Sequence, residues 1–180
     1  MAKQIKTVYI VHHSHTDIGY TDLQERVIQG QANYIRTVLD IMSRPENAAF
    51  RWNCETWFCV EEFLKTASEA DKERLFSLMR EGKVGFSANY LNFCDLVDSG
   101  VLSRRLDEVK ALLGAHGVPV ETAMIADING ISMGQRDALL AHGVKFLFTN
   151  IHCHHGMYPL YQNQNAPDWD RDAMPAGQRG

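Results

Sequence analysis

Short apolar runs alternate with amphipathic helical patterns along most of this chain. Each run is rich in β-branched or aromatic residues, which is typical of buried strands, and the intervals between the runs are long enough for helices. Because parallel strands need a long crossover, usually a helix, the alternation predicts an α/β fold with parallel strands and outer helices. The predicted strands cover residues 7–11, 49–52, 83–89, 122–126 and 144–150.

Helical patterns fill the intervals between these runs. The first has its apolar residues on one side, which suits a helix that covers a sheet, and Thr21 or Asp22 is expected to cap it. His116 and His142 precede glycines at the ends of two others, where each is expected to cap its helix by charge and hydrogen bonding. The predicted helices cover residues 22–42, 57–67, 69–80, 101–115 and 132–141.

Composition and charge narrow the class of protein. With 180 residues and 45% hydrophobic content, the chain is expected to form a single globular domain over residues 1–180. Its segment 157–180 is rich in Asn, Asp, Gln, Pro and Gly, and is expected to be a poorly structured or truncated tail. A net charge of -4 offers no basic surface, so nucleic acid is not an expected partner.

The N-terminal apolar run and the cysteines bear on location. The run is shorter than the signal-peptide core of about 7 residues or more and is followed by histidines, so neither export nor a membrane is expected. The four cysteines stand in no paired spacing and are interpreted as reduced, buried side chains of a cytoplasmic protein.

Polar residues follow every predicted strand. In parallel α/β folds, ligands bind at the carboxyl ends of the strands, so these residues are expected to gather at one face. The polar segments are residues 12–17, 53–55, 92–95, 127–130 and 152–155.

Two of these segments have the chemistry of a metal site. His13, His15 and Asp17 alternate in sequence, so in extended chain they project to one face, where imidazole and carboxylate suit zinc or another first-row divalent ion. Asp127 follows a buried strand directly, and a glycine turn and Ser132 come after it, an arrangement that would fix its carboxylate at the same face. A hydrogen-bonded loop without an ion, and an aspartate that only shapes its loop, are the alternatives.

Both segments resemble those of a known family. Residues 13–20, His-Ser-His-Thr-Asp-Ile-Gly-Tyr, resemble the first-strand signature of family 38 glycoside hydrolases, the α-mannosidase-like group, and residues 126–132 resemble its nucleophile segment. The resemblance implies that His15 and Asp17 bind zinc and that Asp127 is both a zinc ligand and the catalytic nucleophile. It also implies a retaining glycosidase of α-mannoside-like substrates, built on a seven-stranded β/α barrel of which this chain is the N-terminal portion.

The resemblance has gaps. The family normally has Pro-Gly-Trp where this chain has Ile-Gly-Tyr at 18–20, and Pro-Phe at 128–129, where this chain has Ile-Asn. Its last zinc ligand and its general acid come from later in a longer chain, so an incomplete barrel, inactive alone, is expected. Glu55 and Asp95 are candidate proton donors. Further candidates for metal or substrate contacts are His13, Glu55, Asp95, His152, His154 and His155.

Two other functions stay open. Metal-dependent amidohydrolases and phosphoesterases also begin with two histidines separated by one residue on the first strand, and there the ion would activate water. The other alternative is a non-catalytic remnant that binds metal and carbohydrate without turnover.

Overall fold

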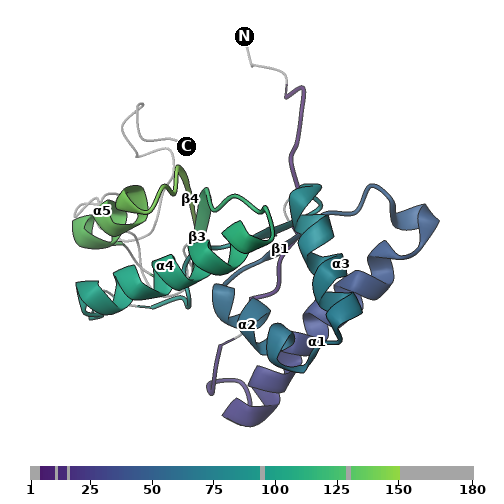
Figure 1. Ribbon diagram of the computed structural model, residues 1–180, viewed down its shortest axis with the longest axis horizontal. Coiled ribbons are helices and arrows are strands. Elements are labelled where there is room, and N and C mark those ends of the chain that lie inside the picture. The colour runs from purple at the N-terminus through teal and green to yellow at the C-terminus, as the bar shows by residue number, and fades with distance from the viewer. Residues whose placement is uncertain (1–4, 11, 16, 94–95, 129–130, 151–180) are drawn as a thin grey trace, which may run out of the picture.

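The computed structural model describes residues 5–10, 12–15, 17–93, 96–128 and 131–150 (Figure 1). Within them the chain is a mixed α/β fold whose strands are short and parallel. The elements are α1 (Gln24–Met42), the 3-10 helix η1 (Pro45–Asn47), β1 (Trp52–Cys54), α2 (Trp57–Thr66), α3 (Glu69–Arg80), β2 (Val84–Phe86), α4 (Ser99–Ala115), β3 (Thr122–Ala126), α5 (Met133–Ala141) and β4 (Phe146–Asn150).

The strands neighbour one another in chain order. β1 pairs with β2 and β3 pairs with β4, both in parallel. Just after β2, the backbone N–H of Ala88 donates to the Thr122 carbonyl at 2.9 Å, which joins the two pairs. Consecutive order is the order of a β/α barrel, whereas a doubly wound sheet reverses its order at a switch point. The described strands therefore form an open part of a barrel-like α/β fold.

The helices pack on the strands in two groups. Figure 1 shows α1, α2 and α3 gathered at one end of the molecule and α4 and α5 at the other. The larger core cluster lies between the first group, β1, β2 and one side of α4, and includes the fully buried Val60, Phe63 and Leu75. The smaller lies between α4, α5 and β3, with Leu106 and Leu139. Each such side chain contributes about 1.5–3 kcal/mol by leaving water.

The predicted strand at residues 7–11 is wrong for its described part, residues 7–10, which have no strand structure. Val8, Tyr9 and Ile10 are 73%, 89% and 71% exposed. An apolar run becomes a strand only beside a partner, and the backbone meets the others only later, where the Asn53 N–H donates to the His12 carbonyl at 2.7 Å.

The other four predicted strands are confirmed in place: β3 has the predicted bounds, and the other three have shifted ends. β1 begins at Trp52, later than predicted, because Phe50 still closes a turn by donating to the Asn47 carbonyl at 2.8 Å. β2 ends at Phe86, because the residues after it bond to β3 partly through side chains.

The predicted helices are confirmed, but one cap is wrong. Leu23 occupies the N-cap of α1, and Asp22 instead accepts a hydrogen bond from the Leu23 N–H at 2.7 Å. Ser132 caps α5 rather than opening it, by accepting from the Gln135 N–H. His142 does bond a carbonyl of its own helix, through Nδ1 to Ala138 at 2.7 Å. His116 holds the C-cap position of α4, and its ring stacks on Phe76.

Cys54 and Cys59 are buried free thiols, as predicted. Cys94, Cys153 and the predicted tail at 157–180 lie outside the described residues. Across the described chain, every helix is too short or too polar to cross a membrane.

Candidate metal centre

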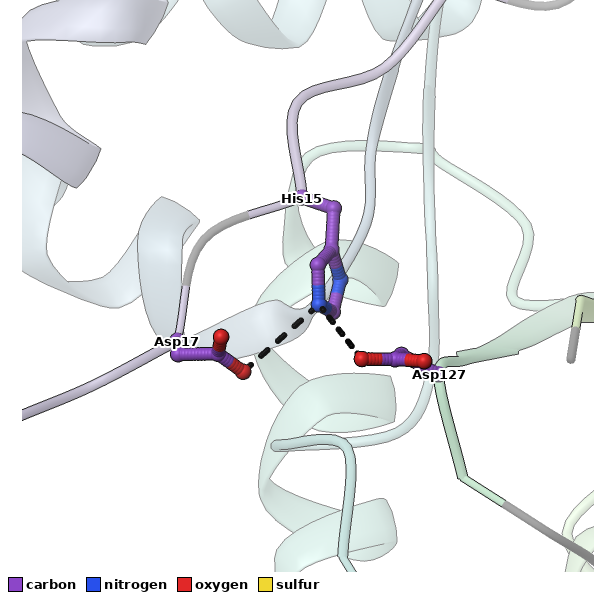
Figure 2. Close-up of side chains that lie close together, drawn as sticks. All are labelled: His15, Asp17 and Asp127. Carbon is purple, nitrogen blue, oxygen red and sulfur yellow. Dashed lines mark ion pairs between the residues drawn. The ribbon is translucent and has the colours of Figure 1, made fainter. Parts of the chain in front are cut away.

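Three predicted ligands converge at the carboxyl end of the strands. His15 and Asp17 come from the loop before α1, and Asp127 follows β3 directly (Figure 2). Nε2 of His15 lies 3.6 Å from Oδ1 of Asp17 and 3.6 Å from Oδ2 of Asp127. One ligand atom from each residue lies within 4.8 Å of the other two. Ligands of one zinc ion, at about 2.0–2.2 Å each, lie within about 4.4 Å of one another, so a small inward movement would close this set on an ion.

Asp127 is held in an unusual conformation. Its φ of 57° is the only positive φ of a non-glycine residue in the described chain. Aspartate tolerates this left-handed region better than most residues, although the conformation still costs free energy. Its Oδ1 is buried and has no hydrogen-bond partner among the described residues. A buried carboxylate oxygen without a donor is costly, and a bound cation would compensate it, so the residues present fit a divalent metal.

The imidazole of His15 is oriented by a hydrogen bond to Glu55. Its Nδ1 lies 2.6 Å from Oε1 of Glu55, on the side of the ring away from Asp17 and Asp127. Burial lowers the pKa of His15, but the hydrogen bond to Glu55 and the charges of Glu55, Asp17 and Asp127 outweigh it and raise that pKa above its usual value. The same negative charges that stabilise a proton on this ring would stabilise a metal ion beside it.

Glu55 is the hub of a hydrogen-bond network behind the ligands. It follows β1 and is 6% exposed. Its Oε2 lies 2.6 Å from Nδ1 of His13, so the predicted ligand His13 contacts Glu55 and stands outside the group of three. Asn92 donates from Nδ2 to Oε1 of Glu55 at 2.6 Å, and its Oδ1 accepts from the Ala126 N–H at 3.0 Å.

A cavity opens in front of these groups. Besides His15, Asp17 and Asp127, its lining includes Gln31, Glu55, Thr56 and Asn92. It can therefore admit a small polar ligand to the three ligand residues.

Sequence reasoning missed two of these residues. Asn92 was expected only as part of a polar segment, although it bridges Glu55 to the end of β3. Gln31 is 7% exposed on the buried face of α1, and a polar residue on an apolar helix face was the signal that could have found it. The candidates Asp95, His152, His154 and His155 lie outside the described residues.

Comparison with known proteins agrees with the resemblance to family 38 glycoside hydrolases. No curated protein matches the chain. A solved structure, the 4-alpha-glucanotransferase from Thermococcus litoralis, is similar in fold, with a TM-score of 0.54 at 15% sequence identity. The match covers 76% of this chain and 21% of that enzyme, so this chain matches about a fifth of that protein's length. Residues 6–171 match the family described as "Glycosyl hydrolases family 38 N-terminal domain". Since this match spans most of its length, the chain belongs to glycosyl hydrolase family 38, as an N-terminal domain of that family.

Proposed function

We propose that the protein is a retaining glycoside hydrolase whose N-terminal domain binds zinc, or another first-row divalent ion, through His15, Asp17 and Asp127. The convergence of these three side chains carries the proposal, because it places one imidazole nitrogen and two carboxylates around one point. The buried Oδ1 of Asp127 supports it, since this oxygen has no donor among the residues that the structure describes and a bound cation would compensate it. The family supports a carbohydrate substrate and hydrolysis of a glycosidic bond.

In this proposal Asp127 attacks the anomeric carbon of the sugar. Retaining glycosidases form a covalent glycosyl-enzyme ester in this step, while a second carboxyl group about 5–5.5 Å away protonates the departing oxygen. Asp127 has a left-handed backbone directly after β3, and it lines the cavity. The metal, when bound, would supply positive charge for sugar hydroxyls and for the carboxylates around it.

The proton donor is proposed to come from outside the described residues. Three carboxylates line the cavity: Asp17, Glu55 and Asp127. Asp17 and Asp127 are assigned to the metal, and both oxygens of Glu55 accept hydrogen bonds from nitrogen donors. Both Glu55 oxygens therefore face neighbouring side chains, so Glu55 is not assigned as the general acid. We therefore expect the 180-residue chain to bind metal and sugar without turnover, and the whole enzyme to hydrolyse its substrate.

An α-mannoside is the proposed substrate, on the resemblance of residues 13–20 and 126–132 to the α-mannosidase-like group. A cytoplasmic location, from the short N-terminal apolar run and the unpaired cysteines, stays a prediction. Aryl α-mannosides compared with aryl α-glucosides, in the whole enzyme, test the choice of sugar. A preference for the glucoside would contradict it.

Calorimetric titration of the chain with zinc tests the metal centre directly. One ion per chain is expected, with loss of binding in Asp17→Asn. The matched control is Asp137→Asn, which removes a carboxylate that is 62% exposed on α5. Equal zinc affinity in the Asp17 variant and the parent would overturn the assignment.

A further inference from the structure

Glu55 is a buried carboxylate that lies within hydrogen-bond distance of nitrogen atoms from two separate segments of the chain. Oε2 faces Nδ1 of His13, and Oε1 faces Nδ1 of His15 and Nδ2 of Asn92, all at 2.6 Å. In the described part of the chain, its ion-pair partners are these two histidines alone. A buried carboxylate is normally paired or fully hydrogen-bonded, and here the donors are two imidazoles and an amide.

This arrangement determines which ring nitrogen of His15 carries hydrogen. An ionised carboxylate can only accept, so Nδ1 of a neutral His15 must be the N–H donor. Nε2 then keeps its lone pair, and Nε2 is the atom that faces Asp17 and Asp127. The hydrogen bond to Glu55 therefore leaves available the one nitrogen that could bind an ion in the candidate centre.

The same carboxylate is tied to Asp127 through Asn92. The Asn92 amide has one orientation that satisfies both neighbours: NH2 to Oε1 of Glu55, and Oδ1 to the Ala126 N–H. Turning the amide over would set oxygen against carboxylate and NH2 against N–H. Ala126 is the residue before Asp127, so one network holds the imidazole ligand and the backbone that carries a carboxylate ligand.

We propose that Glu55 is a positioning residue of the metal centre: it fixes the tautomer and direction of His15 and, through Asn92, anchors the end of β3 beside Asp127. The expected effect on metal affinity rests on the proposed function. Outer carboxylates that hold a ligating histidine typically change metal affinity by about 10- to 100-fold when removed. Glu55 acts through these partners and needs no contact with the substrate.

Nitrogen NMR of the metal-free chain tests the tautomer without any metal. At a pH above the raised pKa of His15, where the ring is neutral, the parent should show N–H at Nδ1 of both His13 and His15. In Glu55→Ala, His15 should show a mixture of tautomers, because no acceptor selects Nδ1–H. Unchanged, pure Nδ1–H at His15 in this variant would overturn the inference.

Glu55→Gln keeps the volume of the side chain, and it decides the question if the alanine variant does not fold. A carboxamide has one oxygen and one NH2, so it cannot accept from both histidines. Its oxygen should face His15 and Asn92, which together offer two donors, and its NH2 should face His13. His13 should therefore move its hydrogen to Nε2 while His15 keeps Nδ1–H. Retention of Nδ1–H at both rings would contradict the network.

Zinc titration then measures the consequence. Affinity should fall about 10- to 100-fold in Glu55→Ala and by a smaller factor in Glu55→Gln. Glu108→Gln, which removes a carboxylate that is 61% exposed on α4, is the charge-matched control and should bind like the parent. Altered tautomers with unchanged zinc affinity would overturn the positioning role. A parent chain that binds no zinc would reject the proposed function instead, and the NMR result would still decide what Glu55 does to His15.

Discussion

The hydroxyl of Ser87 holds both backbone polar groups of Met124. Its Oγ accepts from the Met124 N–H at 2.9 Å and donates to the Met124 carbonyl at 3.2 Å. Ser87 is fully buried, and its Oγ also accepts from the Asn89 N–H. One side chain therefore takes the place of ladder hydrogen bonds between the chain after β2 and the middle of β3.

Removing this hydroxyl should destabilise the domain. Ser87→Ala leaves two buried N–H groups without their acceptor, at a cost on the order of 2–4 kcal/mol in the free energy of unfolding. Urea unfolding followed by circular dichroism measures the loss. Ser43→Ala is the control, because that exposed hydroxyl donates to a carbonyl at the end of α1 and should change stability by about 0.5 kcal/mol or less. If Ser87→Ala were as stable as Ser43→Ala, the hydroxyl of Ser87 would not join the strands.

Asp127→Asn should abolish hydrolysis by the whole enzyme while leaving the fold intact. Asparagine is among the few residues that tolerate a φ near 57°, so the backbone is preserved, whereas the amide is no nucleophile. We expect the rate of aryl α-mannoside hydrolysis to fall by a factor on the order of 10⁴ or more. Circular dichroism and thermal unfolding verify the fold. Activity close to that of the parent would reject Asp127 as the nucleophile.

Zinc should stabilise the folded chain, and a chelator should reverse the effect. An ion that binds only the folded state adds about 2.7 kcal/mol at a free concentration of 100 times its Kd. Thermal unfolding with zinc and then with excess chelator measures the shift. His15→Ala should unfold at the same temperature in both conditions, and a zinc-dependent shift that survives in this variant would place the ion elsewhere.

Tyr90 should make the domain less stable above about pH 10. Burial, together with the charge and hydrogen bond of Glu61, raises the pKa of Tyr90 in the folded chain. Between the unfolded pKa of about 10 and this raised value, the unfolded chain loses the phenolic proton that the folded chain keeps, so stability falls as pH rises.

Tyr90→Phe removes that proton while its ring can still pack edge-on against Phe58, as in the parent. Urea midpoints between about pH 9 and pH 11 should therefore decline less steeply in this variant than in the parent. Glu61→Gln should fall between them, because burial remains while the carboxylate charge is lost. Parallel declines in all three proteins would rule out Tyr90 as the source.

The helices and most strands could be predicted because each buries a face whose period is visible in sequence. The helix at Glu69–Arg80 follows its apolar pattern and Ser68 cap residue by residue. The run at residues 7–11 could not be judged in this way, since its composition is that of a strand whether or not a partner lies beside it. Burial depends on the neighbours, and Val8 and Ile10 are exposed here.

For the candidate site, the strand ends indicated which residues reach the same face, but not how they bond to one another. The meeting of His15, Asp17 and Asp127 follows from their positions after two strand-like runs. The position of Glu55 behind His15 depends on rotamers and on separations of 40 and 42 residues from its two histidines, which no local pattern encodes. The contacts of Asn92 with Glu55 and Ala126 could not be predicted for the same reason.

The left-handed backbone at Asp127 also restricts how this domain can change over evolutionary time. Glycine, asparagine and aspartate adopt such a φ at the lowest cost, and among them only aspartate has an acidic side chain. Under the proposed function, most replacements would therefore be selected against twice, once for lost chemistry and once for strain. Copies of this domain that have lost catalysis should accordingly drift first to asparagine or glycine at this position, and a genome survey could use that substitution as a marker of pseudoenzymes.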